Sequence, residues 1–203
     1  MHRTATSPGR TRRSPLVRLS WLTVGWLVAM VFVVLRPLEA WAAETELASF
    51  ELNHGEDGVF LSYAVNVELS RSVDDALSKA VPLFFVAEAE LYRNRFYWRD
   101  QRVGYAIRRW RIVYQPLTST YRVTFDGGLS QNYSSRAEAF AAISRAARWK
   151  IAEGPQIDEN SRQYIEFSFK LDTSQLPRPM QIGIGGEKDW TISVQRSQKI
   201  NPP

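Results

Sequence analysis

Most of the chain beyond residue 45 alternates between hydrophobic and polar residues. This period of two is typical of β-strands that bury one face. The clearest alternating segments are 48–52, 59–67, 83–92, 121–125 and 165–171. The first two are separated by the polar sequence at 53–58, so they predict a β-hairpin. We expect further strands at 103–114 and at 190–194.

The segment 103–114 changes the parity of its hydrophobic positions. Those in its first half are odd and those in its second half are even: Val103, Tyr105, Ile107, Trp110, Ile112 and Tyr114. One extra residue in a strand exchanges its two faces, so the change predicts a β-bulge near Arg108.

Two short segments have the signals of α-helices. Ser72 is followed by two aspartates, which predicts a helix over 72–80 with Ser72 as its N-cap. Ser135 and Glu138 form a capping box, and helical spacing of small and hydrophobic residues continues to Ala147. This predicts a second helix over 135–148. With no sign of a second domain, the sequence predicts a mainly β, single β-sandwich-like domain with two short helices.

The first 42 residues have a different pattern. An arginine-rich start precedes an uncharged, mostly hydrophobic run at 19–35, and Ala40-Trp41-Ala42 has the small-x-small pattern of a signal peptidase site. Residues 1–42 are therefore predicted to be a signal peptide or, if uncleaved, a membrane anchor helix whose arginines stay in the cytoplasm. Both alternatives make 43–203 an exported domain of the periplasm or another extracytoplasmic space, free or anchored in the inner membrane.

Composition narrows the function of this exported domain. The chain has 26 basic and 21 acidic residues, but 1–42 contain six of the basic residues and one of the acidic ones, so 43–203 are balanced. Net charge therefore gives no reason to expect a nucleic-acid partner. The absence of cysteine excludes disulfides and thiolate sites, and His54 is the one histidine beyond residue 42. We expect no metal and no cofactor.

The best candidate for function is the segment 93–111. It contains seven arginines and a single acidic residue, with aromatic residues interleaved. Arginines beside aromatic rings suit phosphate, carboxylate or glycan surfaces. Alternatively, the arginines pair across strands with Glu88 and Glu90. If the segment is a binding surface, its candidate residues flank the expected hairpin turn: Arg95, Trp98 and Arg99.

Two other groups of polar residues have simple structural explanations. Glu88 and Glu90 lie two residues apart on one strand face, which suits salt bridges better than a catalytic pair. His54 lies beside Glu56 and Asp57 in an expected turn, where polar residues are needed in any case. We therefore expect a protein that is not an enzyme.

Residues 81–91, continuing into Tyr97-Trp98-Arg99-Asp100, resemble a bacterial envelope protein family catalogued as domain of unknown function 4390. Similar segments follow at 109–114, 121–123, 176–179 and 189–190. The resemblance covers most of 45–195. It implies an exported or membrane-anchored protein that is often encoded near a membrane sensor kinase, and it brings no established activity.

Pattern, composition and resemblance together predict a non-enzymatic interaction module at the membrane. Its partner would be an envelope or membrane protein, or an anionic envelope surface, and not a nucleic acid. A cell-envelope hydrolase and a structural or assembly factor are the alternatives.

Overall fold

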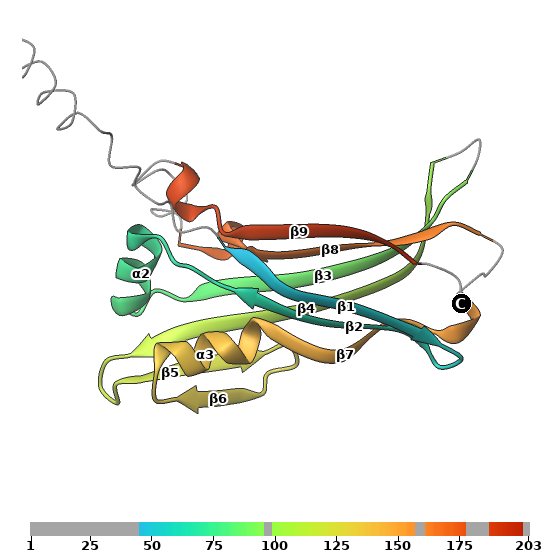
Figure 1. Cartoon of the computed structure of the whole chain (residues 1–203). Helices are drawn as coiled ribbons and strands as arrows, with labels where there is room; N and C mark the ends of the chain where they lie inside the picture. Colours follow the sequence, from blue (N-terminus) through green and yellow to red (C-terminus); the bar gives the residue numbers. More distant parts are fainter. Residues whose placement is uncertain (1–44, 96–98, 157–160, 178–186, 201–203) are drawn as a thin grey trace, which may run out of the picture. The chain divides into compact units, whose positions relative to one another are not determined.

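The computed structural model describes residues 45–95, 99–156, 161–177 and 187–200 (Figure 1). The chain divides into two units, Met1–Trp41 and Ala42–Pro203, and every described residue belongs to the second. The expected signal or anchor at 1–42 thus lies outside the described residues. Within the described ranges, no helix is long and hydrophobic enough to span a membrane.

The described chain forms two antiparallel sheets, in the orders β1-β2-β7 and β6-β5-β4-β3-β8-β9. The smaller sheet consists of β1 (Glu46–Gly55), β2 (Gly58–Asn66) and β7 (Arg145–Ala152). The larger sheet consists of β3 (Leu83–Arg93), β4 (Gln101–Gln115), β5 (Thr120–Phe125), β6 (Ser130–Tyr133), β8 (Gln163–Leu171) and β9 (Ser193–Ile200). The predicted mainly β character is confirmed, and so is the hairpin predicted from the segments 48–52 and 59–67, which are paired as β1 and β2.

Five short helices complete the described chain. The α-helices are α2 (Arg71–Ser78) and α3 (Arg136–Ile143), and the 3₁₀ helices are η1 (Gly154–Gln156), η2 (Thr173–Gln175) and η3 (Glu187–Trp190). The two expected helices are therefore present. In Figure 1, α2 lies at one end of the strands, and α3 packs against β5, β6 and β7.

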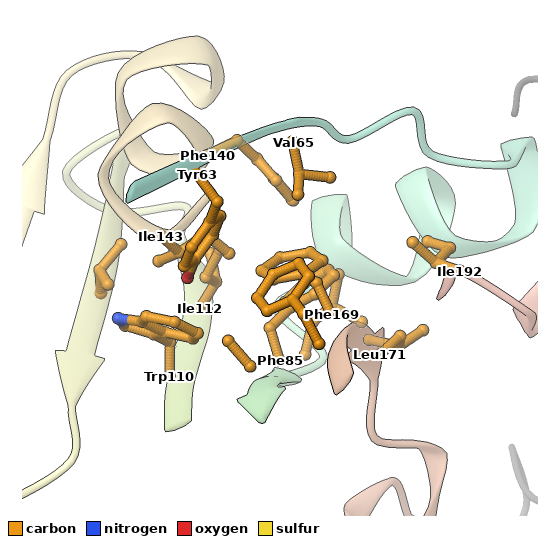
Figure 2. Close-up of a cluster of buried hydrophobic side chains, with 14 of the residues drawn as sticks. Tyr63, Val65, Phe85, Trp110, Ile112, Phe140, Ile143, Phe169, Leu171 and Ile192 are labelled. Atoms are coloured by element: carbon orange, nitrogen blue, oxygen red, sulfur yellow. The ribbon is translucent and has the colours of Figure 1, made fainter. Parts of the chain in front are cut away.

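Both sheets contribute one face to a shared core. Tyr63 from β2, Phe85 from β3 and Phe169 from β8 are buried in the same cluster (Figure 2). The rings of Phe85 and Phe169 stack with their centroids 5.6 Å apart. The alternation on β3 and β8 therefore reflects the burial of one face of each strand, as expected. Their polar residues lie on the opposite face of the larger sheet, which we call the outer face.

The expected bulge near Arg108 is wrong. Pairing between β3 and β4 is regular from Gly104 to Ile112, and its register shifts only between Gly104 and Arg102. Even positions face the core throughout this stretch, whereas Tyr105 is 46% exposed. The inward residues at 104 and 106 are small because β7 lies close: a Cβ at Gly104 would be 2.9 Å from the Cβ of Ala152.

The helix boundaries also differ from expectation. The N-cap of α2 is Ser70, whose hydroxyl accepts a hydrogen bond from the amide of Val73 at 3.3 Å. Ser72 instead donates to the carboxylate of Asp189 at 3.1 Å. Ser135 caps α3 as predicted, but that helix ends at Ile143 rather than 148, and β7 begins two residues later.

The last strand also lies later in the sequence than expected. The segment expected to be the last strand, 190–194, contains the end of η3, and β9 runs from Ser193 to Ile200. Strand β6 was not predicted, because its sequence Ser-Gln-Asn-Tyr has no hydrophobic alternation.

Candidate binding surface

The candidate surface is the outer face of the larger sheet, and strand register determines its side-chain rows. Pairing places Arg111 opposite Phe84, Arg109 opposite Val86, Ile107 opposite Glu88 and Tyr105 opposite Glu90. On the other side of β3, Glu88 lies opposite Ser168 and Glu90 opposite Glu166. The face is thus basic over β4 and acidic over β3, while β8 contributes one acid, Glu166, and one base, Lys170.

The seven arginines of the segment 93–111 fall into different environments. Arg102 forms an ion pair with Glu90 at 2.6 Å, and Arg109 forms a longer one with Asp126 at 3.6 Å. Arg108 faces the interior, where its guanidinium lies 5.1 Å from the ring centroid of Trp149. A guanidinium nitrogen of Arg93 donates to the carbonyl of Gln156 at 3.4 Å.

The three remaining arginines are exposed, and none has a carboxylate partner for its side chain within the described ranges: Arg95, Arg99 and Arg111. Cross-strand pairing therefore explains part of the arginine-rich segment and leaves these cations available.

Glu88 and Glu90 are both in ion pairs, in agreement with their expected structural role. Glu90 accepts hydrogen bonds from Arg102 and from the Tyr92 hydroxyl at 2.8 Å. Burial alone would raise the pKa of Glu90, but these bonds and the Arg102 charge hold that pKa below its ordinary value. A general acid needs the opposite shift. Glu88 pairs with Lys170 at 3.1 Å rather than with an arginine.

The connection between β3 and β4 contains the candidate residues Arg95, Trp98 and Arg99, of which Trp98 lies outside the described residues. Arg95 donates to the side chain of Gln101, and its backbone amide lies 3.4 Å from a carboxylate oxygen of Asp100. The other carboxylate oxygen of Asp100 accepts from the Tyr164 hydroxyl at 2.8 Å. Asp100 thereby ties the base of the connection to β8, while Arg99 makes no such contact with any residue that the structure describes.

Aromatic rings lie on the sheet next to this connection. The rings of Tyr92 and Tyr164 stack with their centroids 5.4 Å apart, and the Arg102 guanidinium lies 4.9 Å from the ring centroid of Tyr105. The hydrogen bond to Asp100, reinforced by burial, raises the pKa of Tyr164 to about 12. Tyr105 therefore lies on the outer face, whereas Arg108 and Trp110 of the same segment face the core.

Two hollows lie on the outer face. One, of about 430 Å³, extends over β3, β8 and β9 and is lined by residues that include Glu88, Glu90, Glu166 and Lys170. The other, of about 170 Å³, lies over β4 and β5, and its charged and polar lining is Arg109, Arg111, Thr124, Asp126 and Gln175. The second hollow is not predicted from the sequence. The spacing of Arg109 and Arg111 was the available signal, since residues i and i+2 share a strand face.

No group of histidine, aspartate or glutamate suitable for a metal ion occurs within the described ranges. His54, in β1, is opposite Val59 and is half-buried. The surface therefore offers charges and rings rather than a metal-ligand cluster.

Comparison with known proteins gives one result. The family model described as domain of unknown function DUF4390 matches residues 42–200. No curated protein and no solved structure matches the chain.

Proposed function

Since the chain belongs to the DUF4390 family, whose function is unknown, we propose that it is a non-enzymatic binding module of the cell envelope. The module recognises a protein partner with the end of the larger sheet where β3 and β4 are joined. The observation that carries this proposal is the exposure of Arg95 and Arg99, whose side chains have no carboxylate partner among the described residues, whereas Arg102 is paired with Glu90.

The chemistry of this end suits an acidic protein surface. A free guanidinium can bind a carboxylate with two parallel hydrogen bonds, which gives both affinity and orientation. Among the described residues, Tyr105 is the exposed aromatic residue of β4 that lies near this end of the sheet, and the Arg102 guanidinium lies over its ring. Tyrosine and arginine are enriched among residues that dominate binding energy at protein interfaces.

The position of this end favours a protein over a membrane surface. The described chain begins at Thr45, beside the α2 end of the strands, whereas the β3–β4 connection lies at the opposite end (Figure 1). Strand β3 has 11 residues, so it separates the two ends by about 36 Å. A lipid surface close to Thr45 would then be beyond reach of Arg95 and Arg99.

The test is affinity capture from membranes with the tagged full-length chain and an Arg95→Ala/Arg99→Ala variant. We expect the variant to lose capture of the partner and the wild-type complex to weaken with salt, because the lost contacts are electrostatic. Stability should change by about 0–1 kcal/mol, the usual contribution of exposed charges. Mass spectrometry of the captured proteins would show whether a membrane sensor kinase is among them.

The matched control is Arg122→Ala/Arg145→Ala, which removes two exposed arginines from β5 and β7. It should capture the partner normally. Equal loss of capture in both variants would indicate a general charge effect. A destabilised Arg95→Ala/Arg99→Ala variant that still captures the partner would show that these arginines serve the fold, and the proposal would fail.

A further inference from the structure

The smaller hollow on the outer face lies at the other end of β4 from the β3–β4 connection. Its charged and polar lining comes from Arg109 and Arg111 of β4, Thr124 of β5, Gln175 of η2 and one acidic residue, Asp126, which follows β5. We propose that this Arg111 hollow binds an oxyanion, a phosphate or a carboxylate, and that Arg111 is its main ligand. From Gln101 to Arg111 the strand extends about 33 Å, so the site is separate from the proposed partner-binding end.

Arg111 has surroundings that suit a residue that binds an anion. Its side chain is exposed, and no carboxylate pairs with it within the described ranges. Strand register places Phe84 opposite it on β3 and Thr124 opposite it on β5. Arg111 therefore has Phe84 and Thr124 as its cross-strand neighbours, and the Thr124 hydroxyl is already hydrogen-bonded to that of Ser130 at 2.9 Å. The planar fork of the guanidinium can donate two hydrogen bonds to one oxyanion.

The neighbouring charges leave the hollow positive. Arg109 is two residues from Arg111 on the same face, and its pair with Asp126 is long, with both side chains more than half exposed. Such a pair is weak, and Arg109 keeps other N–H groups to donate. Asp172, the N-cap of η2, already accepts hydrogen bonds from Ser174 and Gln175. Two arginines thus face one carboxylate.

The size of the hollow defines the class of ligand. Pockets that enclose whole drug-sized molecules measure roughly 300–1,000 Å³, whereas this one measures about 170 Å³. It can therefore hold a phosphate or carboxylate group while the remainder of a larger molecule stays outside. A lipid headgroup and a soluble phosphate offer the same chemistry, and the test distinguishes them.

The test uses a chain from Ala42 to Pro203, because this unit contains both sheets and the core between them. Inorganic phosphate is titrated while the backbone amide signals of Thr124 and Gly127 are followed by NMR. We expect Arg111→Gln to weaken phosphate binding about tenfold, which corresponds to about 1.4 kcal/mol. Asp126→Asn should tighten it about threefold, because a competing charge is removed.

The control is Arg122→Gln, which removes the same charge from β5, where Arg122 donates to Asn132 at 3.1 Å outside the hollow. It should leave phosphate binding nearly unchanged. Equal weakening by Arg111→Gln and Arg122→Gln would overturn the proposal, since only the overall charge would then matter. If Arg111→Gln does not fold, Asp126→Asn decides: unchanged or weaker binding overturns the site.

The source of the oxyanion is tested with vesicles that contain phosphatidylglycerol. Sedimentation of the wild-type unit with the vesicles, lost in Arg111→Gln and kept in Arg122→Gln, would identify a lipid headgroup. Phosphate binding without sedimentation would identify a soluble ligand. Failure of both phosphate and vesicles to bind would overturn the proposal, while the capture experiment on Arg95 and Arg99 would be unaffected.

Discussion

Replacement of Tyr63 by phenylalanine should stabilise the protein. Tyr63 is 2% exposed, and its hydroxyl has no hydrogen-bond partner within the described ranges. In Figure 2 the hydroxyl oxygen lies among the buried side chains, at the end of the ring directed toward Trp110. The ring contacts Phe167 and Trp149, with centroid distances of 4.6 and 6.1 Å. Phenylalanine keeps these contacts and removes only the oxygen.

The magnitude follows from two opposing effects. A buried hydroxyl without a partner costs about 1–3 kcal/mol in desolvation. Removal of one oxygen leaves a small void, which costs about 0.3 kcal/mol at 24 cal/mol per Å³. The net gain for Tyr63→Phe is therefore about 0.7–2.7 kcal/mol. For a domain of this size each 1 kcal/mol raises the melting temperature by about 2–4 °C.

The assay is urea and thermal unfolding of the Ala42–Pro203 unit at pH 7. Burial raises the pKa of Tyr63 well above its ordinary value, although the charge of Arg108 lowers it, so the hydroxyl is neutral in this assay. The control is Tyr164→Phe, which removes a hydroxyl that is bonded to Asp100 and should lose about 0.5–1.5 kcal/mol. A loss of more than about 0.5 kcal/mol in Tyr63→Phe would refute the reasoning, because the hydroxyl would then have a partner such as an ordered water.

Three further predictions concern packing, capping and titration. Gly104→Val should cost about 1–3 kcal/mol in urea unfolding because the added atoms meet Ala152 across the core; a neutral result would show that β7 can move away. Ser70→Ala should cost about 1 kcal/mol as the loss of the α2 N-cap, and no loss would show that another group caps the helix. Tyr164 should ionise near pH 12 in an absorbance titration. Since its pKa is raised on folding, its bond to Asp100 stabilises fully below about pH 10 and is lost between about 10 and 12; ionisation near pH 10 would contradict this.

Strict alternation was sufficient to predict strands β2, β3, β5 and β8. Each has a row of buried, mainly hydrophobic residues on one face and less buried residues on the other, so local sequence and tertiary burial agree. The turn between β1 and β2 was predictable for the same reason. These elements form the core and most of the outer face.

Strand β7 could not be predicted, because its conformation depends on a distant strand. Its sequence Arg-Ala-Ala-Arg-Trp-Lys suits a helix, and the alanines extend the pattern of α3. Pairing with β2 overrides this preference, and the register shifts twice along the pair. Arg148 adopts a φ of 47°, a local irregularity that breaks the alternation.

The wrong prediction of a bulge near Arg108 in β4 has a different physical cause. Tyr105 and Ile107 are hydrophobic residues on the outer face, while the inner positions beneath β7 have room only for Gly104 and Ala106. Large hydrophobic residues therefore did not mark the buried side. The prediction for Arg95 and Arg99 does not depend on which face of β4 is buried, because both residues lie in the connection between β3 and β4.

The inward position of Arg108 changes how the arginine-rich segment should be understood. From composition, seven arginines form one basic patch. In the structure, Arg108 packs on Trp149 between the sheets, whereas Arg109 and Arg111 face outward. A guanidinium on a buried ring supports packing by an interaction worth about 0.5–2 kcal/mol. Loss of binding after replacement of the whole segment would therefore combine a stability effect with a recognition effect, and only single outward arginines can separate the two.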